Sequence, residues 1–362
     1  MRKIDSDTVL SVVVPIYNEI DVIDALVAEV VQAVDALDFP GRFELVLVND
    51  GSTDGSAEML DAIAHRHPDP VKVIHLARNF GHAPAVRAGL DHTTGDAVII
   101  MDGDLQDDPA AFGPFYEKWR DGYDVVYAVR TSRQERLGAP LFFWLFYRIL
   151  NYASEIKMPP DAGNFSLMDR RVVNELESLP ERNRYLPGLR AWVGFHQIGV
   201  PVPRRARYDR STRVGVVGLW KLANNAIFSF SHVPLTLFRT LGLIAIVTSA
   251  ALVSYACYGK FITGEAIKAW MSQFITITFF GGINLLGVGV IGEYVVRIYD
   301  EVKKRPAYVV DQIVTAGKRR AVPAARATAT VTYSDSDERH ERGLLFGGAS
   351  GLRGSSAMPV PE

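Results

Sequence analysis

The chain has 362 residues, enough for one large domain or two modest ones. Its 39 basic and 41 acidic side chains leave a formal charge of −2, which excludes a general electrostatic attraction to nucleic acid. The single cysteine, Cys257, excludes an intrachain disulfide and a thiolate metal cluster.

The first residues include basic side chains but no long apolar run before Asp5 and Asp7. A cleaved secretory signal is therefore not expected, and we expect the N-terminal part of the chain to stay in the cytoplasm.

Four apolar runs rich in β-branched residues follow, and each ends in polar or glycine-rich residues. Each run forms the first part of one segment, and these segments are 9–19, 43–56, 70–79 and 96–106. Helix-like stretches at 19–37 and 81–93 lie between them. Strands that alternate with helices predict an α/β domain with a mostly parallel sheet and with ligand groups at the carboxyl ends of the strands.

A cluster of carboxylates follows the fourth run, at Asp102, Asp104, Asp107 and Asp108. Their charges repel, so the segment is either a solvated acidic loop or a cation site. No GxGxxG or GxxxxGK[ST] motif follows the first run, so phosphates would need another partner. Mg²⁺ or Mn²⁺ held by Asp104, with help from Asp102 and the Gln106 carbonyl, would supply it.

Asp50 follows the second run in the segment NDGSTDGS. A carboxylate at such an edge can accept hydrogen bonds from a nucleobase or a ribose. The same residues equally suit an ordinary Asx or glycine turn.

Two segments without charged residues occupy 240–259 and 269–292. Each has about the ~20 residues that a helix needs to cross a bilayer. The alternative is a pair of core helices in a soluble protein. Basic residues flank the pair on both sides, which predicts a hairpin with both ends in the cytoplasm.

The pattern divides the chain into four regions. These are a catalytic domain at 1–205, a basic juxtamembrane segment at 206–235, a transmembrane hairpin at 236–298 and a cytoplasmic segment at 299–362. The last region lacks apolar periodicity, and we expect disorder beyond about 318. The aromatic stretch 137–155 suits an interfacial helix and a core helix equally, and 214–235 also suits an interfacial helix.

Arginines precede both of these amphipathic stretches. Arg130, Arg133 and Arg136 come before the first, and Arg207 and Arg210 before the second. Guanidinium groups suit phosphate oxygens. Each arginine alone fits a general contact with anionic lipid, whereas Arg130 and Arg133 together favour a substrate phosphate.

Five motifs occur in order: VVVPIYNE, VNDGSTDGS, ARNFGHAPAVRAGL, MDGDLQDDP and DAGNFSLMDRR. With the hairpin that follows, they resemble family-2 glycosyltransferases of the polyprenyl-phosphate hexosyltransferase type. That group contains dolichol-phosphate mannose synthases and bactoprenol glucosyltransferases. The resemblance covers roughly residues 9–312.

The resemblance implies a GT-A fold and an inverting transfer of a hexose from a nucleotide sugar to polyprenyl phosphate, on the cytoplasmic face of the inner membrane. It assigns the metal and diphosphate group to Asp102, Asp104 and Gln106. It assigns the nucleotide pocket to Pro15, Tyr17, Glu19 and Asp50, and the border of the donor to Arg78, Asn79 and Gly81. It also assigns Asp161 to the catalytic loop, and lipid-phosphate contacts to Arg207, Arg210 and Ser211.

The chain departs from the family in two places. Asn164 stands where many relatives carry a second acid, and YDRSTRVG differs from the pattern expected around Arg210 and Ser211. UDP-glucose is the first expectation for the donor, with GDP-mannose next. A processive polysaccharide synthase and a noncatalytic membrane scaffold are the alternatives, and the membrane helices also allow a homo-oligomer.

Overall fold

The structure, a computed structural model, describes residues 1–130, 162–179, 181, 185–203, 205, 233–258, 261–262, 270–315 and 318–321. All structural statements below concern these residues.

Strands and helices alternate over the first 130 residues, as the hydrophobic pattern predicts. In chain order the elements are β1 (Val9–Ile16), α1 (Ile23–Asp35), β2 (Arg42–Asn49), α2 (Ser56–Arg66), β3 (Val71–Leu76), α3 (His82–Leu90), β4 (Ala97–Ile100), the 3₁₀ turn η1 (Pro109–Ala111), α4 (Phe112–Arg120) and β5 (Val125–Arg130).

The remaining elements lie between residues 162 and 321. They are β6 (Ala162–Asp169), α6 (Arg170–Ser178), α7 (Leu186–Trp192), β7 (Gln197–Val202), α9 (Val233–Tyr258), α10 (Trp270–Val302), β8 (Val310–Thr315) and β9 (Lys318–Ala321).

The nine strands of the described chain form one sheet in the order β7-β5-β6-β4-β1-β2-β3-β8-β9. Strands β4, β1, β2 and β3 run parallel, whereas β6, β8 and β9 are antiparallel to their neighbours. The prediction of an α/β domain with a mixed sheet is confirmed. Of these nine strands, β6 and β8 run opposite to the other seven, so the sheet is mostly parallel in strand direction.

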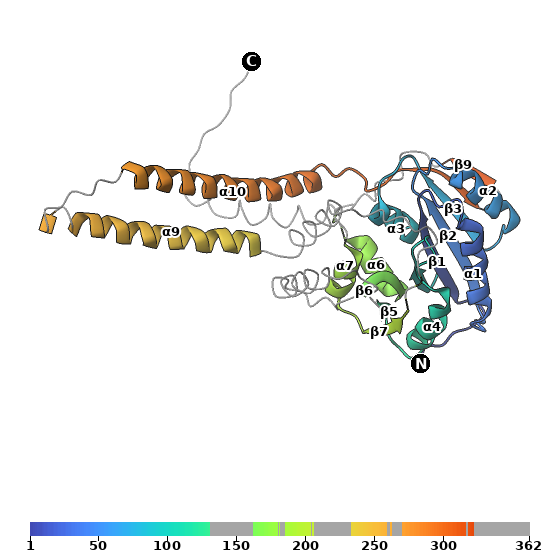
Figure 1. Cartoon of the computed structure of the whole chain (residues 1–362). Coiled ribbons are helices and arrows are strands. Elements are labelled where there is room, and N and C mark those ends of the chain that lie inside the picture. Colours follow the sequence, from blue (N-terminus) through green and yellow to red (C-terminus); the bar gives the residue numbers. More distant parts are fainter. Residues whose placement is uncertain are drawn as a thin grey trace, which may run out of the picture. The chain divides into compact units, whose positions relative to one another are not determined.

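Both faces of the parallel core are buried (Figure 1). Helices α1, α2 and α4 pack on one face, and α3, α6 and α7 pack on the other. Neighbouring residues of β1 therefore belong to different clusters: Val12 faces the first group of helices and Val13 the second. This double burial explains why β1 is a continuous apolar run.

The last two strands were not anticipated from the sequence. β8 pairs with β3 and β9 pairs with β8, so residues that follow α10 extend the sheet formed by the first 205 residues. Residues 318–321, at the start of the segment expected to be disordered, form β9.

Two long helices, α9 and α10, lie where the two membrane spans are predicted. They contact each other, and a Cβ placed on Gly287 of α10 would lie 3.3 Å from the ring of Phe238 in α9. By length and composition, one segment of the described helices is suited to cross a membrane, Phe279–Val302. Phe238–Ala251 is a shorter apolar helix, so the prediction of two spans is not confirmed.

Candidate active site

Four loops meet at one edge of the sheet, because parallel neighbours β4, β1, β2 and β3 all end there. The structure thus brings together most of the site residues predicted in the first half of the chain. They are Tyr17, Glu19, Asp50, Arg78, Asn79, Gly81, Asp102, Asp104 and Gln106, together with Pro15 near the end of β1.

Each of these loops contains a residue in the left-handed backbone region. The φ angles are 54° at Asn18, 65° at Gly51, 101° at Gly81 and 56° at Leu105. Glycine adopts this region freely, whereas for Leu105 it costs on the order of 1 kcal/mol. Leu105 is only 8% exposed and packs in the core, which holds the strained turn between Asp104 and Gln106 in place.

Two glycines let neighbouring loops approach closely. A Cβ on Gly51 would lie 2.5 Å from the backbone of Arg78, and one on Gly103 would lie 2.8 Å from the carbonyl oxygen of Pro15. The loop after β2 therefore contacts the loop after β3, and the loop after β4 contacts the end of β1.

The Asp50 carboxylate holds the loop that follows β3. Its Oδ1 accepts a hydrogen bond from the backbone N–H of Phe80 at 2.7 Å, and its Oδ2 accepts one from that of Gly81 at 2.9 Å. Burial raises the pKa of Asp50 above its usual value, although the two N–H groups oppose that shift. Asp50 was predicted to line the nucleotide pocket, and in the structure both of its oxygens bind this loop.

The four crowded carboxylates divide into two pairs. Asp107 is 7% exposed and accepts the backbone N–H of Asp102 at 3.1 Å. Asp108 caps η1 by accepting the N–H of Ala110 at 3.0 Å. These two therefore stabilise the turn. Asp104 also contributes to it, because its Oδ1 accepts the backbone N–H of Gln106 at 3.2 Å. Asp102 and Asp104 are the residues that the resemblance assigns to the cation.

Asp102 pairs with His82, a residue that sequence reasoning missed. The His82 Nε2 lies 2.8 Å from Asp102 Oδ1, and the imidazole is about half exposed. Burial opposes a charge on His82, but the hydrogen bond to Asp102 and the nearby carboxylates outweigh it and raise the pKa of His82 above its usual value. The first residue of α3 thus brings to the acidic edge an imidazole whose protonated form the carboxylates favour.

The donor atoms at this edge fit a hard divalent cation. They are carboxylate oxygens of Asp102 and Asp104, and Mg²⁺ takes few protein ligands and completes its shell with water and phosphate. Among the described residues, no group of three or more His, Cys, Asp or Glu side chains is arranged to hold a metal. The backbone carbonyl of Gln106 accepts the N–H of Arg205 at 3.0 Å. The fit therefore rests on the two carboxylates.

Arg205 ties the segment after β7 to this acidic turn. Its guanidinium bonds Asp108 at 2.8 Å and Glu29 of α1 at 2.6 Å. This role of Arg205 could not be predicted from sequence patterns, because Asp108 and Glu29 lie 97 and 176 positions away.

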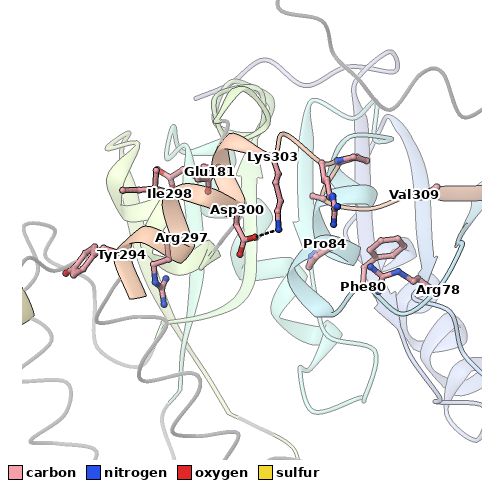
Figure 2. Close-up of a pocket in the computed structure, with 14 residues that line it drawn as sticks. Arg78, Phe80, Pro84, Glu181, Tyr294, Arg297, Ile298, Asp300, Lys303 and Val309 are labelled. Carbon is pink, nitrogen blue, oxygen red and sulfur yellow. Dashed lines mark ion pairs between the residues drawn. The ribbon is translucent and has the colours of Figure 1, made fainter. Parts of the chain in front are cut away.

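A pocket of about 860 Å³ lies between the loop after β3 and the C-terminal end of α10 (Figure 2). Arg78 and Phe80 line it from the loop, and the Arg78 guanidinium stacks over the Phe80 ring at 4.2 Å. Arg297, Lys303 and Arg305 line it from the other side, with Lys303 paired to Asp300 at 3.5 Å. The pocket is fixed at its base, where the N–H of Ala77 donates to the carbonyl of Val309 at 2.9 Å.

Several predicted residues lie outside the described part of the chain. They are Arg133, Arg136, Asp161, Arg207, Arg210 and Ser211, together with the stretches 137–155 and 214–232. The backbone of Arg130 is described and ends β5.

Comparisons with known proteins place these features in a family. The model for glycosyl transferase family 2 matches residues 11–177. The glycosyltransferase YkcC of Bacillus subtilis is 41% identical over 83% of this chain and 93% of its own. The bactoprenol glucosyl transferase of Shigella phage SfX is 38% identical over 83% of this chain and 98% of its own. The solved structure of a mannosyltransferase from Pyrobaculum calidifontis, in complex with GDP-Man and Mn²⁺, matches 80% of this chain and 87% of its own. The sequence identity is 18% and the TM-score is 0.41, so this similarity is too distant to inform the site.

Proposed function

The chain belongs to glycosyl transferase family 2, and from this premise we propose that it transfers a hexose from a nucleotide sugar to polyprenyl phosphate. UDP-glucose is the donor we expect first. Similarity to a bactoprenol glucosyl transferase over almost the whole of that relative supports the acceptor and the sugar.

The observation that carries the proposal is the acidic edge where the four loops meet. Asp102 and Asp104 both belong to the loop that follows β4, which the bonds of Asp107 and Asp108 hold in place. When bound, Mg²⁺ or Mn²⁺ would stabilise the negative charge that develops on the leaving β-phosphate. The neighbouring loops after β1, β2 and β3 would then orient the nucleotide.

The acceptor needs little chemical activation. A polyprenyl phosphate is already an anion, so positioning and charge neutralisation suffice and no strong general base is required. One acceptor oxygen attacks the anomeric carbon as the bond to the nucleoside diphosphate breaks on the opposite face, which inverts the configuration. We propose that basic side chains hold the acceptor phosphate. The cations of the 860 Å³ pocket are the described candidates, and Arg130 remains a candidate from the sequence.

Exposed apolar side chains support membrane anchoring. Ile246 of α9 is 67% exposed and Leu285 of α10 is 75% exposed, and many neighbours on both helices are similar. Apolar surface on this scale marks an interaction site, and the helix lengths fit a bilayer. We propose that the bilayer covers both helices.

The sheet topology supports two crossings. β7 precedes both helices and β8 follows them, yet both strands belong to one sheet and therefore lie on one side of any membrane. If α10 crosses, the chain must cross once more before it, and α9 is the described helix available. This argument favours the hairpin. We propose that the catalytic domain lies on the cytoplasmic side of the inner membrane, because basic residues flank the two helices on both sides.

The test is an assay of membranes that contain the protein, with Mg²⁺, polyprenyl phosphate and a panel of radiolabelled UDP- and GDP-sugars. We expect label from UDP-glucose in the chloroform-extractable fraction, and its loss with EDTA. Label from GDP-mannose alone would change the sugar but keep the reaction class. Water-soluble polymer as the labelled product would indicate a polysaccharide synthase, and donor binding without turnover would indicate a scaffold.

A further inference from the structure

A row of buried polar side chains runs through the sheet beside the proposed donor site. Asn49 at the end of β2 is 4% exposed, His75 of β3 is 4% exposed and Asp61 of α2 is 7% exposed. Polar groups at this depth are costly unless they bond each other. Asn49 and His75 are paired in register across β2 and β3, which places their side chains in contact.

The direction of each hydrogen bond in this row is fixed by its neighbours. The backbone N–H of Ser52 donates to Asn49 Oδ1 at 3.0 Å, so the amide nitrogen of Asn49 faces His75. That nitrogen only donates, and therefore His75 Nδ1, 3.0 Å away, accepts. The ring proton consequently sits on His75 Nε2, which donates to Asp61 Oδ1 at 3.1 Å.

The far end of the row comes from the C-terminal strand pair. The second oxygen of Asp61 pairs with the guanidinium of Arg319 in β9. β9 is held by β8, which in turn pairs with β3 directly beside His75. The part of the chain that follows α10 therefore supplies the last member of the row.

The near end of the row reaches the loops proposed to bind the nucleotide. Ser52 Oγ accepts the backbone N–H of Asn18 at 3.1 Å, and Asn18 Oδ1 accepts the N–H of Thr53 at 2.8 Å. Asn49 is also adjacent to Asp50, which holds the loop after β3. The row thus ends in the loops that follow β1 and β2.

We propose that Arg319, Asp61 and His75 are positioning residues for the donor site, acting through Asn49 on the loops after β1 and β2. The C-terminal strands β8 and β9 then complete the catalytic domain as well as extending its sheet. The claim that these residues affect binding of the donor rests on the proposed function. The claim that they hold the loops after β1 and β2 in place does not.

Loss of the Arg319 side chain leaves one Asp61 oxygen without its ion pair and loosens the row at its exposed end. For Arg319→Gln we expect the donor KM to rise roughly 3- to 10-fold with little change in kcat. Asp61→Asn keeps one acceptor oxygen but turns an N–H₂ group toward either His75 Nε2 or the Arg319 guanidinium, both of which donate, and should raise the donor KM by roughly tenfold or more. The KM for polyprenyl phosphate should stay unchanged in both variants.

The matched control is Arg320→Gln, which removes the same charge from the neighbouring position of β9. Arg320 pairs in register with Ile313, whereas Arg319 pairs with Val314, so the two side chains point to opposite faces of the strand. Arg319→Lys keeps the charge and should restore most of the donor affinity.

The experiment measures donor KM and kcat for the full-length protein and its variants, together with hydrogen exchange of the loops at 17–20 and 50–55. Expected are faster loop exchange and a raised donor KM in Arg319→Gln and Asp61→Asn, but not in Arg320→Gln. In addition, ¹⁵N NMR of histidine-labelled protein should show His75 as the Nε2–H tautomer.

Equal loop exchange and equal donor KM in Arg319→Gln and Arg320→Gln would overturn the inference while leaving the proposed function intact. If the wild-type protein transfers no sugar, the proposed function fails. The exchange comparison then decides the inference alone, because faster loop exchange in Arg319→Gln supports positioning and unchanged exchange overturns it.

Discussion

Replacement of Asp50 by asparagine should loosen the loop that follows β3. The carboxylate is 3% exposed and accepts two backbone N–H groups, from Phe80 at 2.7 Å and Gly81 at 2.9 Å. An asparagine can accept one of them and turns its own N–H₂ toward the other. The loss of one charge-assisted bond, with a half-buried N–H left unsatisfied, costs about 2–3 kcal/mol.

Hydrogen exchange measured by mass spectrometry on peptides covering 77–83 tests this prediction. A local loss of that size makes exchange at Phe80 and Gly81 roughly 30- to 150-fold faster. Asp54→Asn is the control, because Asp54 accepts the N–H groups of Ser56 and Ile20 and should leave this loop unchanged. Equal exchange of the loop in wild type and Asp50→Asn would refute the role given to Asp50.

Two further predictions follow from the same edge. Gly51→Ala should lower the free energy of unfolding by more than about 1 kcal/mol, because φ is 65° and the new Cβ would lie 2.5 Å from the Arg78 backbone. Gly113→Ala in α4 should raise the free energy of unfolding by about 0.5–1 kcal/mol, because a Cβ on Gly113 would have no atom within 4 Å beyond its neighbours in the helix. Urea denaturation of the two variants compares these effects directly. In metal-free buffer, the pair of His82 with Asp102 should stabilise the fold by less than about 1 kcal/mol, since both groups are partly exposed. The pKa of His82 is raised in the folded state. The stability that the pair contributes is therefore complete below about pH 6.5 and is lost as the pH rises through the pKa of His82 in the folded protein. A stability difference between wild type and His82→Gln that grows with pH would contradict the pairing of His82 with Asp102.

The parallel core and its loops were predictable because their signals are local. Each of the first four strands is a continuous apolar run, and the polar residues that follow it fall at one edge once the strands are parallel. The motif residues from Pro15 to Gln106 therefore lie at the ends of the parallel strands, as the hydrophobic pattern predicts.

The antiparallel strands and the inner polar contacts were not predictable in this way. β8 pairs with β3, which lies more than two hundred residues earlier in the chain, and β9 pairs with β8. Arg205 pairs with carboxylates 97 and 176 positions away, and Arg319 pairs with one 258 positions away. The sequence also could not show which of the four carboxylates stabilise the turn, because the capping role of Asp108 and the buried bond of Asp107 depend on the folded chain. His82 was not predicted as a site residue, because a single histidine at the start of a helix forms no sequence pattern that indicates a function.

The most direct test of the central claim is the Mg²⁺-dependent transfer of glucose from UDP-glucose to polyprenyl phosphate by purified wild-type protein and by Asp104→Asn. Asp121→Asn serves as the matched control, because Asp121 caps the far end of α4 and pairs with Lys118 at 3.5 Å. The account predicts lipid-linked glucose from wild type and Asp121→Asn, and at least a roughly hundredfold loss of transfer in Asp104→Asn. Transfer by Asp104→Asn at the wild-type rate, with the same dependence on Mg²⁺, would contradict the account, because the acidic edge would then not be the place where the sugar is transferred.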